Sequence, residues 1–297
     1  QQYDLVFIET GDDPLLIASL PQRVLNKTVV RFHSTSDTEY LFIGKHKKYK
    51  LRRLFWHLLA CYNVKYLSAT NAFHLGFAHQ KVLRNNKIRH HEVIINYVPE
   101  IPDMQVKVNT QRKFFMLGRM DEEGYRQKGF DLLLTALLVL EGPFKKHHAK
   151  LTIVGSGKHY ETFSRVCKQY DFVEVVPYLH HHEVMQELQS SDVVLLPSLF
   201  EGLSMFALEA LANANAVVFS NTGGLKDLVH ENGLLIEPGN ALALANAIKE
   251  MLTMSDEELL MMKQNSLKWI QQHFNADVQW QQIKSIYQQV HRYGASR

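Results

Sequence analysis

The feature that most limits how this chain can fold is a regular alternation of short β-rich runs and helical patterns from Lys113 onward. The β-rich runs are continuously apolar, as in VVLL at 193–196, which is typical of strands buried on both faces. We predict strands at Lys113–Leu117, Lys150–Val154, Val173–Val176, Asp192–Leu196, Ala216–Phe219 and Leu234–Ile236. Such alternation predicts an α/β fold, with a parallel sheet that helices cover on both faces.

Helices are predicted between these strands and after the last of them. They are placed at Gly129–Leu140, Lys158–Tyr170, His182–Gln189, Ser204–Asn213, Leu225–Val229, Ala241–Leu252, Asp256–His273 and Ala276–Tyr293. The first 108 residues look like the second half of another α/β domain, with strands in DLVFIE, KTVVRF, VKYLSAT and HEVIINY and a helix at Leu51–Tyr62. Because residues 98–110 carry two prolines and little helical pattern, we interpret them as the linker.

Length and composition narrow the class of protein. A chain of 297 residues is long enough for one large domain or two ordinary ones, and 46% hydrophobic with 21% charged residues indicates a globular protein. A net charge of +3 is too weakly basic to indicate nucleic acid as a partner. Cys61 and Cys167 indicate no disulfide framework, which favours the cytoplasm. No apolar run predicts a membrane span, and a start without Met suggests that the natural beginning is missing.

Two carboxylates interrupt an otherwise apolar stretch. Glu201 and Glu209 are the only charged residues between Asp192 and Lys226. A buried carboxylate needs a partner or water, and a diol with two O–H donors would suit Glu209 on its helix. The alternative is that Glu201 lies on a loop surface and Glu209 on a half-exposed helix face.

The loop before that helix is a predicted anion site. Ligands of open α/β sheets bind beyond the carboxyl ends of the strands, and a helix beginning near Ser204 offers free N–H groups for phosphate. Gly202 would let the backbone approach such a ligand. Arg119 ends another strand and Lys128 precedes another helix, so both could neutralise a diphosphate. The alternative for Arg119 and Lys128 is an ordinary solvated loop.

The sequence contains two further clusters of charged or titratable residues. The basic run Lys45–Arg53, followed by Trp56, suggests docking on an anionic membrane surface, and the alternative is a solvated helix face over a core stripe. The three histidines at 180–182 are interpreted as a solvated helix start rather than a metal site, because a structural site needs more ligands at defined spacing.

These motifs together resemble one enzyme family. Glu201 and Glu209, preceded by Pro197-Ser198, resemble the E-x7-E signature of the retaining glycosyltransferases of family 4, also called glycosyl transferases group 1. Gly118-Arg119 with Lys128-Gly129 is similar to that family's diphosphate site. The segments VGSG, NTGGLKDLV and NGLLIEPGN follow in the family's order.

The resemblance implies a GT-B type fold, made of two Rossmann-like doubly wound domains. Residues 1–108 would form the acceptor-side domain, 109–275 the domain that binds a nucleotide-sugar donor, and 276–297 a helix that crosses back to the first domain. The family's early Gly-rich loop has no counterpart here, so the N-terminal domain is expected to be truncated. The family usually has a glycine after the helix that carries Glu209; here NANA stands, and we predict a left-handed Asn215.

The resemblance also assigns roles to residues. Those assigned to the donor are Arg119, Lys128 and the backbone at Gly202, Leu203 and Ser204 for the diphosphate, Glu209 for the ribose hydroxyls and Tyr178 for the base. Glu201 and His33 would be catalytic and contact the transferred sugar, although His33 could instead be a capping or packing residue. No metal is expected, and the chain has no Asp-x-Asp motif.

The implied function is a retaining, metal-independent glycosyltransferase. It would move a sugar from a nucleotide-diphosphate sugar to a glycan or lipid-linked acceptor, in the synthesis of a cell-surface polysaccharide or glycolipid. It would work in the cytoplasm, peripherally on the inner face of the membrane. Two alternatives stay open: a GT-B nucleotide-sugar epimerase or hydrolase, and a non-catalytic protein that binds nucleotide sugars.

Overall fold

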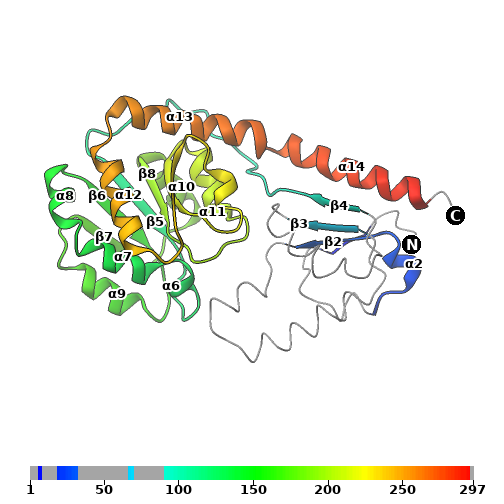
Figure 1. Cartoon of the computed structure of the whole chain (residues 1–297), viewed down its shortest axis with the longest axis horizontal. Coiled ribbons are helices and arrows are strands. Elements are labelled where there is room, and N and C mark those ends of the chain that lie inside the picture. Colours follow the sequence, from blue (N-terminus) through cyan, green and yellow to red (C-terminus); the bar gives the residue numbers. More distant parts are fainter. Residues whose placement is uncertain (1–5, 9–18, 33–65, 70–89, 295–297) are drawn as a thin grey trace. The chain divides into compact units, whose positions relative to one another are not determined.

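The computed structural model describes residues 6–8, 19–32, 66–69 and 90–294, and Figure 1 draws the others as a grey trace. The chain divides into a first unit, residues 1–97 with 275–297, and a second unit, residues 98–274. The second unit begins at Val98, at the start of the predicted linker. The backbone ties this segment to the second unit, because the Val98 amide donates to the Phe274 carbonyl at 3.1 Å and Asn109 donates to the Asp192 carboxylate.

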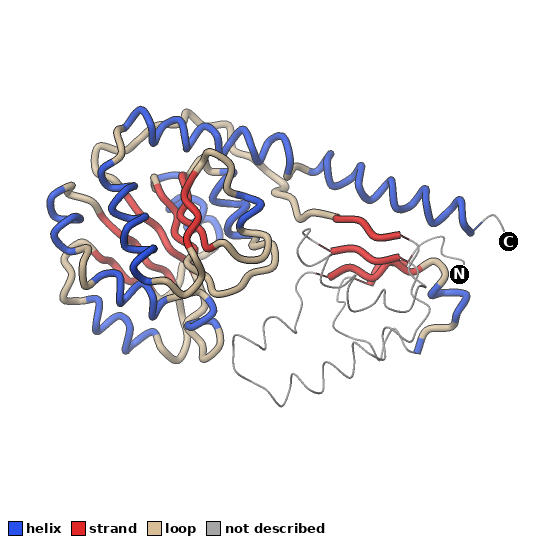
Figure 2. The backbone as a smooth tube through the Cα atoms, viewed as in Figure 1, coloured by secondary structure: helices blue, strands red, loops and turns tan. Residues whose placement is uncertain are grey.

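A six-stranded parallel sheet forms the centre of the second unit (Figure 2). Its strands are β5 (Lys113–Leu117), β6 (Lys150–Val154), β7 (Val173–Val176), β8 (Val193–Leu196), β9 (Ala216–Ser220) and β10 (Gly233–Ile236). In space the order is β10-β9-β8-β5-β6-β7, with Phe114 opposite both Leu151 and Val193. The chain thus runs outward from β5 to β7 and then returns to β8 beside β5. This reversal of strand order is the switch point at which open α/β sheets leave a crevice.

Helices alternate with these strands. They are α6 (Gly124–Gln127), α7 (Phe130–Leu137), α8 (Glu141–Lys146), α9 (Tyr160–Cys167), α10 (His181–Ser190), α11 (Met205–Ala212), the 3-10 turn η2 (Lys226–Leu228), α12 (Ala241–Thr253) and α13 (Asp256–His273). Every residue of β8 and β9 is buried, as the continuous apolar runs predict for strands covered on both faces. Rings of Phe114, Phe144 and Phe172 pack in the core, with the last two stacked at 4.5 Å.

The C-terminal end of α11 differs from the prediction. The left-handed residue is Ala214, with φ 53°, and not Asn215. The Asn215 amide donates to the Ala210 carbonyl and the Ala214 amide to the Leu211 carbonyl. This Schellman arrangement requires the left-handed conformation one position before Asn215. The Asn215 side chain donates instead to the carbonyls of Leu188 and Ser191, both at 2.9 Å.

Cys167, at the end of α9, is buried at 1% exposure, and burial raises the pKa of its thiol from 9.0 to about 12. We expect the native protein to resist iodoacetamide at this cysteine at pH 8, because the thiolate is the reactive form. Since the unfolded chain loses this proton first, the thiol's contribution to stability falls as the pH rises from about 9 to about 12. Peptide mass spectrometry before and after denaturation measures the labelling, and labelling of the native protein would contradict the burial.

The described residues of the first unit include four parallel strands in the order β1-β2-β3-β4. The elements are β1 (Val6–Ile8), α2 (Gln22–Leu25), β2 (Thr28–Phe32), β3 (Tyr66–Ala69), β4 (His90–Val93) and α14 (Ala276–Gly294). Helix α14 buries Ile286 and Val290 against Val29 and Ile94. The predicted helix Leu51–Tyr62 lies outside the described residues. Within the described ranges, no helix is long and apolar enough to span a membrane.

Candidate functional site

The loops that follow β5, β8 and β9 meet backbone to backbone at the switch point. The Leu199 amide donates to the Gln127 carbonyl at 2.8 Å, and the Gly224 amide donates to the Gly202 carbonyl at 2.8 Å. Gly129 and Gly223 have φ +76° and +50°, and an added Cβ would overlap the carbonyl oxygens of Pro197 and Glu201 respectively. Larger residues would force these loops apart, so both glycines hold the loops around Glu201.

Lys128 and Glu201 form an ion pair at the centre of these loops. Lys128 Nζ donates to Glu201 Oε1, and Ser198 Oγ donates to the same oxygen at 3.1 Å. The two side chains are only 16% and 9% exposed. Glu201 is therefore a buried, partnered carboxylate and not a loop-surface residue. The Lys128 side chain also packs on Gly118, just after β5. Lys128 therefore links the loop after β5 to the loop after β8, which carries Glu201.

The first turn of α11 adjoins this pair. Ser204 is the N-cap, and its hydroxyl oxygen accepts from the Ala207 amide at 3.4 Å. Leu203 is buried, whereas Gly202 and Ser204 are partly exposed. A helix N-terminus carries partial positive charge and free N–H groups, so this turn adds positive potential beside the Lys128–Glu201 pair.

Arg119 lies in the loop that follows β5. Its Nη1 is 3.1 Å from Asp121 Oδ2, and the Arg119 side chain is exposed while that of Asp121 is partly exposed. Asp121 also accepts from the Gly124 amide at 2.6 Å, at the start of α6. The structure therefore joins Lys128 with Glu201 and pairs Arg119 with its neighbour Asp121.

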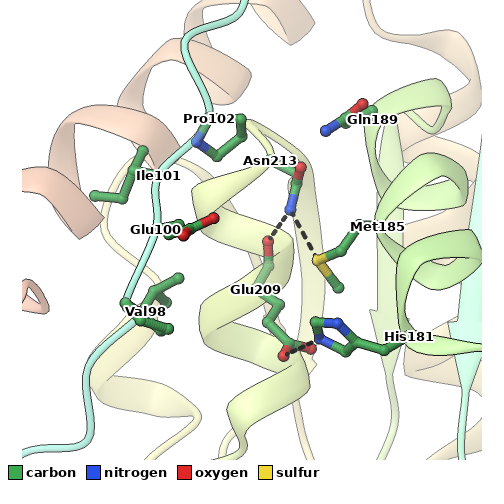
Figure 3. Close-up of a pocket in the computed structure, with 10 residues that line it drawn as sticks. Val98, Glu100, Ile101, Pro102, His181, Met185, Gln189, Glu209 and Asn213 are labelled. Carbon is green, nitrogen blue, oxygen red and sulfur yellow. Dashed lines mark hydrogen bonds and ion pairs between the residues drawn. The ribbon is translucent and has the colours of Figure 1, made fainter.

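Glu209 projects from α11 into a cavity of about 560 Å³, shown in Figure 3. Its Oε1 lies 3.2 Å from Nε2 of His181, the first residue of α10, and the Glu209 side chain is 20% exposed. The cavity is lined by Val98, Pro99, Glu100, Ile101, Pro102, His181, Met185, Gln189, Glu209 and Asn213. Glu209 is thus partly buried and paired. Tyr178 lies outside this lining, is 63% exposed and packs edge-on against His180.

The three histidines at 180–182 have separate environments. The His180 amide donates to Glu183 Oε2 at 2.6 Å at the start of α10, His181 contacts Glu209, and the His182 ring stacks on His180 at 5.9 Å. In the part of the chain that the structure describes, no group of three or more His, Cys, Asp or Glu side chains could hold a metal ion.

His181 is the residue at the site that the sequence analysis did not assign. The three histidines were interpreted as a solvated helix start, yet His181 reaches the predicted ribose residue Glu209. A signal was available, because α10 follows β7 and so begins near the carboxyl edge of the same sheet. His33 and the basic segment Lys45–Arg53 with Trp56 lie outside the described residues, so their predicted roles stay predictions.

Comparison with known proteins fits this geometry. The family Glycosyl transferases group 1 matches residues 98–269. An uncharacterized glycosyltransferase of Methanocaldococcus jannaschii is 33% identical over 132 residues, which cover 43% of this chain and 33% of that protein. The chain spans between 33% and 41% of the length of the first curated relatives that it matches.

Two solved structures show the fold. Sucrose-phosphate synthase from Thermosynechococcus elongatus has a TM-score of 0.70 at 20% identity, over 93% of this chain and 70% of that chain. Anabaena HepE, in complex with UDP and glucose, has a TM-score of 0.69 at 18% identity, over 99% of this chain and 78% of that chain.

Two parallel α/β units and the reversal of strand order in the second one are those of an α/β protein of the GT-B type, so the predicted fold class is confirmed. The family match extends over more than half of the chain and includes both Lys128 and the two glutamates. The chain belongs to the glycosyl transferases group 1 family, which confirms the resemblance found in the sequence.

Proposed function

We propose that this protein is a retaining glycosyltransferase that uses a nucleotide-diphosphate sugar as donor. The observation that carries the proposal is the buried Lys128–Glu201 pair at the N-terminus of α11, beside the switch point. Departure of a nucleoside diphosphate needs cationic groups and N–H donors at the oxygens that gain charge. Lys128, Arg119 and the backbone at Gly202, Leu203 and Ser204 would supply them, and the proposal requires no metal ion.

The nucleoside end of the donor is assigned to the second unit as well. Glu209 would accept hydrogen bonds from the ribose hydroxyls, and Tyr178 would contact the base. The complex of HepE with UDP and glucose supports a donor of the UDP-sugar type for a protein of the same fold. Glu201 would contact the transferred sugar, since its carboxylate pairs with Lys128, which is assigned to the diphosphate.

The acceptor side is proposed from sequence alone. His33 would contact the transferred sugar, and the acceptor would be a glycan or a lipid-linked sugar in the synthesis of a cell-surface polysaccharide or glycolipid. The segment Lys45–Arg53 with Trp56 would hold the protein on the cytoplasmic face of an anionic membrane. Vesicle co-sedimentation with and without anionic lipid would test this last part.

Calorimetric titration tests the donor site directly. We expect one of UDP, GDP and ADP to bind, and Glu209→Ala to weaken that binding by about 1–3 kcal/mol, because ribose hydroxyls would lose their acceptor. Glu250→Ala is a matched control, since Glu250 is an exposed carboxylate on α12, and it should bind as the wild type does.

The outcomes separate the proposal from its alternatives. Absence of binding by all three nucleotides to a folded protein would contradict a donor site in this chain. Turnover of a nucleotide sugar without acceptor would instead favour an epimerase or hydrolase. Binding without transfer to any acceptor by the full-length protein would favour a non-catalytic nucleotide-sugar-binding protein.

A further inference from the structure

The contact between His181 and Glu209 crosses from one helix to the next. Nε2 of His181 and Oε1 of Glu209 are 3.2 Å apart, and Figure 3 shows the ring pointing from α10 across to the carboxylate on α11. An ionised carboxylate only accepts hydrogen bonds, so the imidazole nitrogen that faces it is the donor. Among the described residues, His181 is the one side chain that pairs with this carboxylate.

Both ends of this contact are fixed by their own helices. Glu183 accepts the His180 amide at the start of α10, which sets the direction of the next residue, His181. On α11, the Asn213 side chain donates to the Glu209 carbonyl at 2.8 Å. The Glu209 backbone is thus held in α11, and the His181 contact restricts the rotation of its side chain.

The contact adds little to folding. The His181 side chain is 74% exposed, and pairs with one exposed partner contribute little to stability. We expect the contact to affect ligand binding in the cavity instead. The acidic side chains of the cavity lining are Glu209 and Glu100, and the basic one is His181. A carboxylate that is held in place before a ligand arrives loses less conformational freedom on binding.

We propose that His181 is a positioning residue that presents Glu209 to the two hydroxyls of a nucleotide ribose. This inference rests on the proposed function. Oε1 accepts from His181 and still has a free lone pair, and Oε2 has two, so one carboxylate can accept both hydroxyls while it is held. His181 thereby acts through Glu209 on the ribose and not on the reacting sugar.

The experiment compares UDP with 2′,3′-dideoxy-UDP, which lacks both hydroxyls, by calorimetry on the full chain. His181→Ala should weaken UDP binding by about threefold to tenfold and leave dideoxy-UDP binding unchanged. His181→Gln should restore part of the loss, because its amide also donates. His182→Ala is the matched control on the same helix and should bind both nucleotides as the wild type does.

Equal weakening of both nucleotides by His181→Ala would overturn the inference, because that outcome indicates general damage to the site. Unchanged UDP binding would overturn it as well, while the donor site itself stands. If the wild type binds GDP or ADP in place of UDP, the same cycle is run with that nucleotide and its dideoxy form. If the wild type binds none of the three, the proposed function fails and this inference fails with it.

Discussion

Replacement of Lys263 by methionine is expected to lower the free energy of unfolding by about 3 kcal/mol. Lys263 on α13 pairs with Asp192 Oδ1 at 3.0 Å, and the two side chains are 4% and 0% exposed. The substitution leaves the Asp192 charge buried without its cation. The carboxylate still accepts hydrogen bonds from the Asn109 amide, the Asn109 side chain and the Lys113 amide. The expected loss of stability is therefore at the lower end of the range for a broken buried ion pair.

Urea unfolding followed by circular dichroism measures this effect. The double variant Asp192→Asn with Lys263→Met should regain part of the lost stability, because no unpaired charge is then buried. The recovery is incomplete, because both oxygens of Asp192 accept N–H bonds and the new NH2 group faces one of these donors. Lys158→Ala is the control. Lys158 forms a solvent-exposed ion pair with Glu122, so removal of this pair should change the free energy of unfolding very little. A single Lys263→Met variant as stable as the wild type would show that the pair is not buried as the structure has it.

Lys263 also gives the stability a pH dependence. Burial lowers the pKa of its ammonium below the ordinary 10.5, and Asp192 opposes this shift. Between the lowered native value and 10.5 the unfolded chain binds more protons than the native one. The contribution of this residue to the free energy of unfolding therefore rises with pH across that window, and Lys263→Met should remove the rise.

Continuous apolar runs predicted the strands of the second unit well. β5, β6 and β7 have the predicted bounds. The apolar runs of β5 and β6 fill inner positions of the sheet, while β7 lies at its edge and is only partly buried. Helices α6 and α8 were missed, since their four and six residues are too few for a helical period to show. The start of α6 depends on Asp121, which accepts the Gly124 amide, and only the folded loop shows that contact.

The sequence was enough to identify the carboxylates of the candidate site, but not the residues that pair with them. Spacing and apolar surroundings singled out Glu201 and Glu209 as carboxylates that need partners. The partners lie far along the chain, because Lys128 reaches Glu201 through the meeting of the β5 and β8 loops and His181 reaches Glu209 through the packing of α10 on α11. Such pairs depend on strand order, and the reversal that places β8 beside β5 is not encoded in any local pattern.

The largest effect on activity is expected at Lys128. Lys128→Ala should lower kcat/KM for sugar transfer by about 100-fold to 1,000-fold, the range for loss of one donor that stabilises developing charge. The Nζ of Lys128 lies against Glu201, within the proposed diphosphate site. Initial rates with the donor and acceptor that the wild type uses measure this loss. Nucleotide binding gives a second measurement that needs no acceptor. Lys128→Ala should bind UDP more weakly than the wild type does and should bind uridine equally well.

The same lysine neutralises Glu201, so a loss of rate must be separated from a loss of fold. The Glu201 side chain is 9% exposed, and without Lys128 it keeps the Ser198 hydroxyl as a hydrogen-bond donor. Thermal unfolding of Lys128→Met and of the double variant Glu201→Gln with Lys128→Met makes the separation, because the double variant buries no unpaired charge. Lys145→Ala, which removes a lysine paired with Glu141 on α8, should leave rate and stability unchanged.

A double variant that regained stability but not rate would place Lys128 in the diphosphate site. One that regained both would make the pair a structural support and move the chemistry elsewhere.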